Sequence, residues 1–138
     1  MTEKELQEKV LTYRFMEARL DGLVKQRDMM VSKIIELQST LQSIDELDKS
    51  EGEILFPIGG EAYRTAKIID KNKLIVDVGA NVALEKTTEE GKDLIIKRKG
   101  EIEGLINQIQ HEIVKVSNAM NQLGPELQEM TKQMQQAG

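Results

Sequence analysis

The stretch from Glu53 to Lys86, EILFPIGGEAYRTAKIIDKNKLIVDVGANVALEK, holds nearly all of the strand-like pattern in this chain of 138 residues. Turn-forming residues interrupt its apolar runs at Gly59-Gly60, at Asp70–Lys73 and at Gly79–Asn81. Glycine readily adopts the positive φ angles of a tight hairpin, and Asp and Asn form local backbone hydrogen bonds in turns. The pattern predicts four short strands in a meander, at residues 54–58, 62–69, 74–78 and 82–86.

The predicted strands carry more apolar surface than one small sheet can cover. Pro57 has no N–H to donate, so the first strand is expected at an edge, and open edges pair readily with other chains. We therefore predict an assembly surface, where strands from several subunits close into a barrel or platform. A sheet that packs on the helices of its own chain is the alternative. The residues expected in the subunit interface are Ile54, Phe56, Ile58, Ile68, Leu74, Val76, Val78, Val82 and Leu84.

The residues before this stretch have the pattern of one long helix, predicted over 2–48. Thr2 followed by Glu5 fits a capping box at its start. Apolar residues then recur in steps of three and four, with Glu17 and Arg27 on the seam positions between them, which is typical of a coiled-coil seam; the phase shifts near Arg27. The seam residues are Leu6, Val10, Tyr13, Leu20, Val24, Met30, Ile34, Leu37, Leu41 and Ile44. The charged segment 45–52 is expected to separate this helix from the strands.

The residues after the stretch predict a second long helix, over 87–137. Gly124-Pro125 is its one strong breaker, where we expect the helix to kink or to end locally. Two seams of similar length on either side of the strands predict antiparallel helices, which brings Leu6 and Val10 near Met130 and Met134. The second seam consists of Ile95, Lys99, Ile102, Ile106, Ile109, Ile113, Val116, Met120, Leu123, Leu127, Met130 and Met134.

Composition excludes several classes of function. The net charge is −5, with acidic and basic residues interspersed, so the concentrated basic face that binds nucleic acid is not expected. The chain has no cysteine, which excludes disulfides and fits a cytoplasmic protein. No apolar run approaches the length of about 18 residues that a membrane span needs. We expect a soluble, cytoplasmic protein with no membrane partner.

The sequence also lacks the elements of catalysis. Gly59-Gly60 is not followed by the Gly-Lys-Ser/Thr pattern of a P-loop. His111 is the only histidine and no cysteine accompanies it, so a metal site is not expected. We predict no enzyme activity, no catalytic residue, no metal and no cofactor.

The paired ends of the two predicted helices carry more apolar residues than one seam can use. Methionine is unbranched and polarizable, so it adapts to irregular apolar partners, and promiscuous binders use such surfaces. We predict a binding surface there. Two alternatives stand beside it: the methionines belong to an ordinary seam, or a third or fourth helix covers the extra residues. The candidate binding residues are Leu6, Val10, Leu11, Tyr13, Phe15, Met16, Met120, Leu123, Leu127, Met130 and Met134.

The order of long helix, two β-hairpins and long helix resembles an alpha-type prefoldin subunit of the archaeal kind. So does the text LFPIG at Leu55–Gly59, followed some twenty residues later by VDVG at Val76–Gly79. Asn81 departs from the pattern, because a glycine or small residue is expected there. The resemblance covers essentially the whole chain. It implies an α+β, mostly helical fold in a single domain, 1–138: a long antiparallel two-helix coiled coil joined by two β-hairpins, which assemble into an oligomeric β-barrel platform.

The resemblance also implies a function. Two alpha subunits would join four prefoldin beta subunits in a hetero-hexamer. This chaperone would capture unfolded or nascent client proteins at its coiled-coil tips without ATP, and deliver them to a group II chaperonin. The competing hypothesis is a structural coiled-coil scaffold subunit without client-binding activity. A helical-hairpin appendage of an enzyme is a weaker third possibility, because no catalytic domain is attached.

Overall fold

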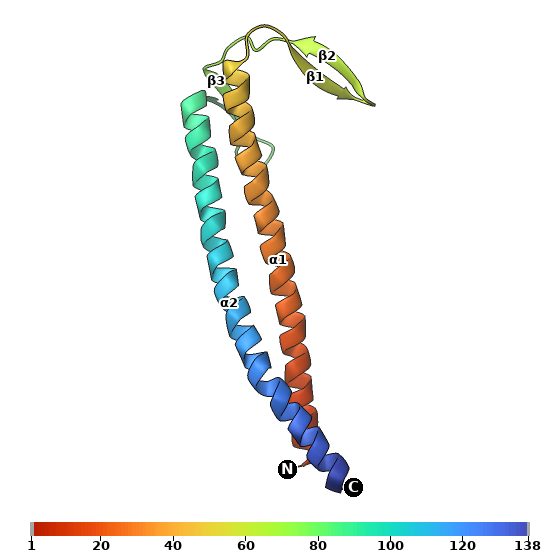
Figure 1. Cartoon of the computed structure of the whole chain (residues 1–138). Helices are drawn as coiled ribbons and strands as arrows, with labels where there is room; N and C mark the ends of the chain where they lie inside the picture. Colours follow the sequence, from red (N-terminus) through yellow and green to blue (C-terminus); the bar gives the residue numbers. More distant parts are fainter. Residues whose placement is uncertain (1, 138) are drawn as a thin grey trace. The chain divides into compact units, whose positions relative to one another are not determined.

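The computed structural model describes residues 2–137. Its two long helices enclose two β-hairpins in the sequence, as predicted, so the α+β, mostly helical fold class is confirmed (Figure 1). The elements are α1 (Glu3–Lys49), β1 (Ile54–Gly59), β2 (Ala62–Ala66), β3 (Lys73–Asp77), β4 (Ala83–Thr87) and α2 (Thr88–Ala137). Contacts divide the chain into two units. Unit 1 contains the residues up to Ser32 and those from Glu103 on, and unit 2 contains residues 33–102.

Local side-chain hydrogen bonds explain where the helices begin. The backbone N–H of Glu5 donates to the Thr2 hydroxyl at 3.2 Å, and the Thr2 N–H donates to the Glu5 carboxylate at 3.4 Å. This is the reciprocal pair of the predicted capping box. At the start of α2, the Glu90 N–H donates to the Thr87 hydroxyl at 3.1 Å. Both helices therefore begin with a hydroxyl that satisfies a free backbone donor.

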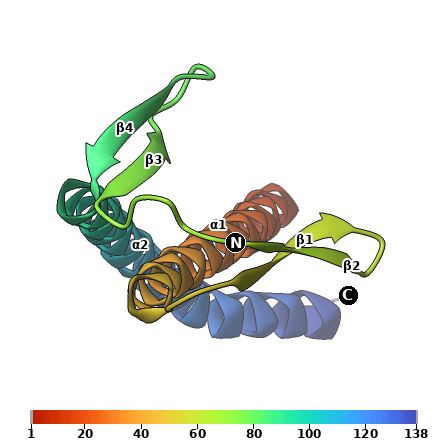
Figure 2. The same cartoon turned by 90° about the horizontal axis from the view of Figure 1, so that it is seen from above.

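The strands form two separate two-stranded antiparallel sheets, β1–β2 and β3–β4 (Figure 2). The prediction of one continuous meander is wrong, because β2 ends at Ala66 and does not pair with β3. Two hydrogen bonds join the segment between β2 and β3 to the start of α2. The Thr88 N–H donates to the Asn72 carbonyl at 3.0 Å, and the Thr88 hydroxyl donates to the Lys71 carbonyl at 2.6 Å. The bond between Thr88 and Asn72 continues the β3–β4 ladder by one residue pair, and no strand pairs with the other edge of β3.

Proline and turn residues fit these short hairpins. Pro57 lies opposite Tyr63, and the register shifts between Pro57 and Gly59. Each strand of a two-stranded sheet is an edge strand, which is where proline, with no N–H to donate, is tolerated. In the β3–β4 turn, Asn81 has φ = 61°, the left-handed conformation that asparagine tolerates, and Ala80 has φ = 51°.

Unit 2 has a small core between the two helices. Leu37 and Ile44 of α1 and Ile95 of α2 are buried, and Leu74 of β3 packs against them. The second hairpin is tied to α2 a second time, because Arg98 donates to the carbonyl oxygen of Asp77 at 2.7 Å. The β3–β4 hairpin is therefore held on the helices by both apolar packing and a charge-assisted hydrogen bond.

Unit 1 holds its two helical segments together by the predicted seam. Ile109, Ile113 and Met130 of α2 are buried, and the α1 seam residues of this unit are half-buried. Side-chain pairs cross between the helices at its margins: Lys9 with Glu126, Arg19 with Glu112 at 3.2 Å, and Arg27 with Gln110 at 3.2 Å. Rising numbers on α1 pair with falling numbers on α2, which confirms the predicted antiparallel arrangement.

Gly91 is the glycine whose lack of a side chain matters for packing. A Cβ there would lie 2.3 Å from Leu74 Cδ2 and 3.3 Å from Leu74 Cβ and Cγ, whereas Gly100 and Gly104 face open space. We expect Gly100→Ala to raise the free energy of unfolding by about 1 kcal/mol through helix propensity. We expect Gly91→Ala to lower it by about 1 kcal/mol, because overpacking costs about 1–3 kcal/mol and propensity offsets only part of this. Urea unfolding of both variants checks this, and equal stabilisation would contradict the close packing of Leu74 on α2.

The ion pair between Asp45 and Lys92, 2.7 Å apart, predicts a pH dependence for unit 2. The hydrogen bond from Lys92, and then its charge, hold the pKa of Asp45 below its ordinary value. The hydrogen bond to Asp45 raises the pKa of Lys92. A lowered acid pKa stabilises the fold above the unfolded pKa, and this stability is lost as the pH falls through the folded pKa. The Lys92 contribution is present below its unfolded pKa and is lost as the pH rises through its folded pKa.

We therefore expect Asp45→Asn to weaken the loss of stability between about pH 5 and pH 2, the range in which carboxylates protonate. The effect is small, because both side chains are partly exposed and surface pairs contribute little. Chemical unfolding at several pH values measures it. Glu46→Gln is the matched control, since Glu46 forms no ion pair with any residue in 2–137. If Asp45→Asn kept the acid slope of the parent protein, the pair would not stabilise the fold.

Candidate functional site

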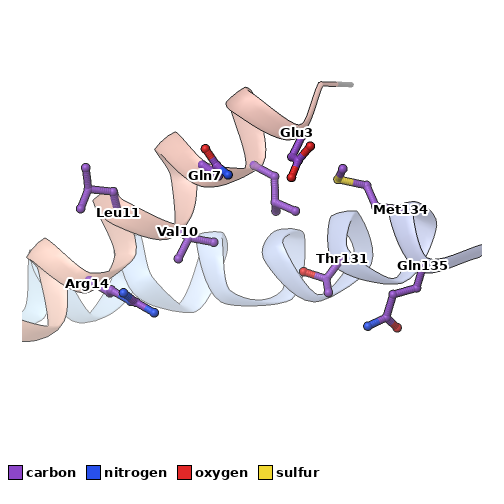
Figure 3. A pocket seen from close by; sticks show the side chains of 9 residues that line it. Glu3, Gln7, Val10, Leu11, Arg14, Thr131, Met134 and Gln135 are labelled. Carbon is purple, nitrogen blue, oxygen red and sulfur yellow. The ribbon is translucent and has the colours of Figure 1, made fainter. Parts of the chain in front are cut away.

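A groove of about 560 Å³ lies in unit 1, between the first turns of α1 and the last turns of α2 (Figure 3). Its apolar lining comes mainly from α1, as Leu6, Val10 and Leu11, with Met134 from α2. The remaining lining residues are polar: Glu3, Gln7, Arg14, Thr131 and Gln135.

The groove exists because the two helices contribute unequal apolar stripes. Where α1 lines the groove with Leu6, Val10 and Leu11, α2 contributes Met134 beside the polar residues Thr131 and Gln135, so most of the apolar lining lies on one helix. A helix pair buries only the part of an apolar face that meets its partner. The rest of this face remains open to a ligand.

The apolar surface of α1 continues beyond the groove. Leu11 is 55% exposed and Phe15 is 68% exposed. These two residues are four positions apart, so they lie on the same face of the helix, one turn from each other. Together with the groove they form an apolar area that the two helices of unit 1 leave uncovered.

The eleven candidate binding residues divide into two groups in the structure. Leu6, Val10 and Met134 are half-buried and line the groove together with the exposed Leu11, and Phe15 is exposed beside Leu11. The others lie at or near the contact between the helices: Met130 is only 3% exposed, and Tyr13, Met16, Met120, Leu123 and Leu127 are half-buried. The first group is accessible to a ligand in this conformation. A binding role for either group stays a prediction.

Helix α2 continues through Gly124-Pro125 to Ala137, so the helix does not end at this breaker. Proline at position 125 removes one backbone donor, and the following residues resume the helical hydrogen bonds. Tyr13 packs here, since a Cβ on Gly124 would lie 3.6 Å from Tyr13 Cε2. This distance is an ordinary van der Waals contact, so the Tyr13 ring packs beside Gly124 without requiring a glycine there.

The charged ends of the groove were not predicted. Apolar periodicity alone does not identify Glu3 and Arg14. Both line the groove together with its apolar residues. The signal that identifies them is their spacing of eleven residues, which places both on nearly the same face of α1. This spacing identifies Glu3 and Arg14 as groove residues only once the apolar residues between them are known to line a groove.

The predicted interface residues on the hairpins also divide into two groups. Leu74 and Val76 of β3 are shielded within unit 2, where Leu74 packs on the helical core and Val76 is buried. Phe56, Ile58, Val78, Val82 and Leu84 are exposed, and Ile54 and Ile68 are half-buried. A role in assembly stays a prediction for all nine residues.

Further exposed apolar residues on the hairpins were not predicted. Leu55, Tyr63 and Ile75 are exposed, and Ile69, between β2 and β3, is fully exposed. Along β1, Leu55 and Phe56 are consecutive, so they lie on opposite faces of the strand and both faces are apolar. The continuous apolar run at 54–56 was the available signal for this arrangement.

The described residues give no support for a metal site or for a membrane-spanning helix. No group of three or more His, Cys, Asp or Glu side chains within 2–137 could hold a metal ion. Across the same residues, neither helix has an apolar stretch long enough to cross a membrane.

Comparisons with known proteins agree with this architecture. The family model described as "Prefoldin subunit" matches residues 13–133. Prefoldin subunit alpha of Pyrococcus horikoshii is 26% identical over 130 residues, which cover 92% of this chain and 88% of the relative. Prefoldin subunit alpha of Methanosarcina barkeri is 24% identical over 140 residues, which cover 98% and 97% of the two chains.

A solved structure has the same fold. The cryo-EM structure of filamentous PFD from Methanocaldococcus jannaschii matches with a TM-score of 0.73 and 22% sequence identity, covering 87% of this chain and 98% of that chain. The family match extends over most of the sequence, including both hairpins and most of both helices. The chain belongs to the prefoldin family of chaperones, as a subunit of the alpha type.

Proposed function

We propose that this subunit acts in an ATP-independent holdase, which captures unfolded or nascent proteins at the ends of its coiled coil and delivers them to a group II chaperonin. The observation that carries the proposal is the uncovered apolar area of unit 1, formed by the groove together with Leu11 and Phe15. Non-native proteins expose apolar side chains, and such a surface can cover them without any chemical step.

Binding energy alone accounts for the proposed mechanism. Fully burying a leucine or phenylalanine side chain stabilises a complex by about 1.5–3 kcal/mol, and the two exposed residues here can contribute only part of this. One such surface holds a client weakly. Several surfaces in one assembly hold it firmly, because each further contact is intramolecular, while each single contact can still dissociate. Weak individual contacts also permit transfer to another chaperone.

The hairpins support the assembly part of the proposal. Each two-stranded sheet has two open edges, and Phe56, Ile58, Val82 and Leu84 remain exposed on the strands and turns. Pairing with strands of other subunits would satisfy the edges and cover these side chains. We propose that two copies of this chain assemble with four beta-type subunits through a β-barrel platform, and that the complex works in the cytoplasm.

The proposal predicts that Leu11→Gln/Phe15→Gln impairs holding activity. The two exposed side chains supply apolar contact area, so we expect the protein concentration for half-maximal suppression of aggregation to rise about tenfold, equivalent to about 1.4 kcal/mol. The assay follows light scattering of a chemically denatured test protein diluted into the full chain, alone and assembled with beta-type subunits. Circular dichroism verifies that the helices form.

Met29→Gln is the matched control, because Met29 is 74% exposed on the same helix but lies about four turns from Phe15, away from the groove. We expect this variant to retain the holding activity of the parent. Equal losses in both variants would indicate a general loss of surface hydrophobicity. Full activity of the double variant would overturn the proposed site. An assembled protein that never suppresses aggregation would instead favour the structural scaffold without clients.

A further inference from the structure

The groove of unit 1 has one charged residue at each end. Figure 3 shows Glu3 near Met134 at one end and Arg14 at the other, with Val10 between them. No other charged side chain lines the groove among the residues described. Eleven residues of helix correspond to about 16 Å along the axis and to three turns with a small remainder. The two opposite charges therefore lie on one face of α1, too far apart to pair with each other.

Neither charge is used inside the protein. Within residues 2–137, Glu3 and Arg14 form no ion pair and no side-chain hydrogen bond. Their neighbours behave differently, because Lys9 pairs with Glu126 and Arg19 pairs with Glu112 across the two helices. The pairs between the two helices involve neither Glu3 nor Arg14, so both charges remain available to a ligand.

The helix dipoles do not remove this polarity. The first turn of α1 carries a partial positive charge and the last turn of α2 a partial negative charge. Both lie at the Glu3 end of the groove, where they offset each other. The groove therefore has a negative end at Glu3, an apolar middle, and a positive end at Arg14.

We propose that this groove selects client segments in which a short apolar stretch is flanked by charges of opposite sign. The basic end of the segment would lie at Glu3 and its acidic end at Arg14. An extended chain advances about 3.3 Å per residue, so about five apolar residues span the distance. This inference rests on the proposed function of the groove and adds the chemistry of the preferred client.

Apolar contact and charge have separate roles in this proposal. The apolar middle supplies most of the affinity, because it removes hydrophobic surface from water. The charges add a preference of a few fold, since ion pairs at exposed sites are weak and are screened by salt. An extended segment can enter in either direction, so the order Lys–core–Glu or Glu–core–Lys should not matter. Two like charges always leave one end mismatched.

Four fluorescent peptides with one common five-residue apolar core test the proposal. Their cores are flanked by Lys and Glu, Glu and Lys, two Lys, or two Glu, and fluorescence anisotropy with the full chain measures their dissociation constants. At low ionic strength we expect both peptides with opposite ends to bind about 2- to 5-fold more tightly than those with like ends. The difference should vanish in about 1 M salt, where the Debye length is about 3 Å.

Charge reversal supplies the sharper comparison. Arg14→Glu makes both ends of the groove acidic, so the peptide with two Lys should become the tightest ligand. Glu3→Lys should favour the peptide with two Glu. Lys25→Glu changes the net charge as Arg14→Glu does, but at a residue paired with Asp21 outside the groove. This control should keep the order of the parent protein. Where a reversal lowers helical content, Arg14→Gln should make the Lys–Glu and Lys–Lys peptides bind equally.

The outcomes separate the two proposals. If all four peptides bind the parent with equal affinity, or if their order follows only their net charge, the selection by flanking charges is overturned and the apolar capture site stands. If no peptide binds at any salt concentration, the proposed capture site fails together with the selection. Peptide orders that change with Arg14→Glu and Glu3→Lys, but not with Lys25→Glu, would establish the selection.

Discussion

The packing of one apolar stripe on α1 against one apolar stripe on α2 is the interaction on which the rest of this structure depends. In each unit, two helical segments cover only the faces that meet, as with Leu37, Ile44 and Ile95 in unit 2. Apolar residues outside the stripe remain in water, because a helix pair has no third layer. The exposure of Leu11 and Phe15 is a direct consequence of this constraint.

The same constraint governs the hairpins. A two-stranded sheet cannot bury both of its faces by itself. Leu74 and Val76 are covered within unit 2, while Ile75 between them points away and is exposed. The chain thus leaves apolar area on the hairpins and apolar area at the groove, and we attribute the first to assembly with other subunits and the second to clients. Assembly would cover the apolar area on the hairpins and leave the apolar area at the groove open to clients.

Much of the fold followed from local patterns, and the errors came from contacts that are distant in sequence. Steps of three and four residues located both helices, and Gly59-Gly60 and Gly79 located the hairpin turns. The predicted meander failed because β2 ends at Ala66 and residues 67–72 leave it unpaired with β3, which no local pattern reveals. Likewise, periodicity placed Met130 and Met134 on one stripe, but only the contact between helices buries the first and leaves the second beside the groove.

Site-specific photo-crosslinking tests the central claim, capture of clients at the groove, most directly. A photoreactive phenylalanine derivative would replace Phe15, or Met29 as a reference of similar exposure on the same helix. The assembled protein would then be illuminated with a denatured client bound. Capture at the groove predicts strong crosslinks from position 15 and weak ones from position 29. Equal crosslinking from both positions, or none from position 15 while the client stays soluble, would contradict it.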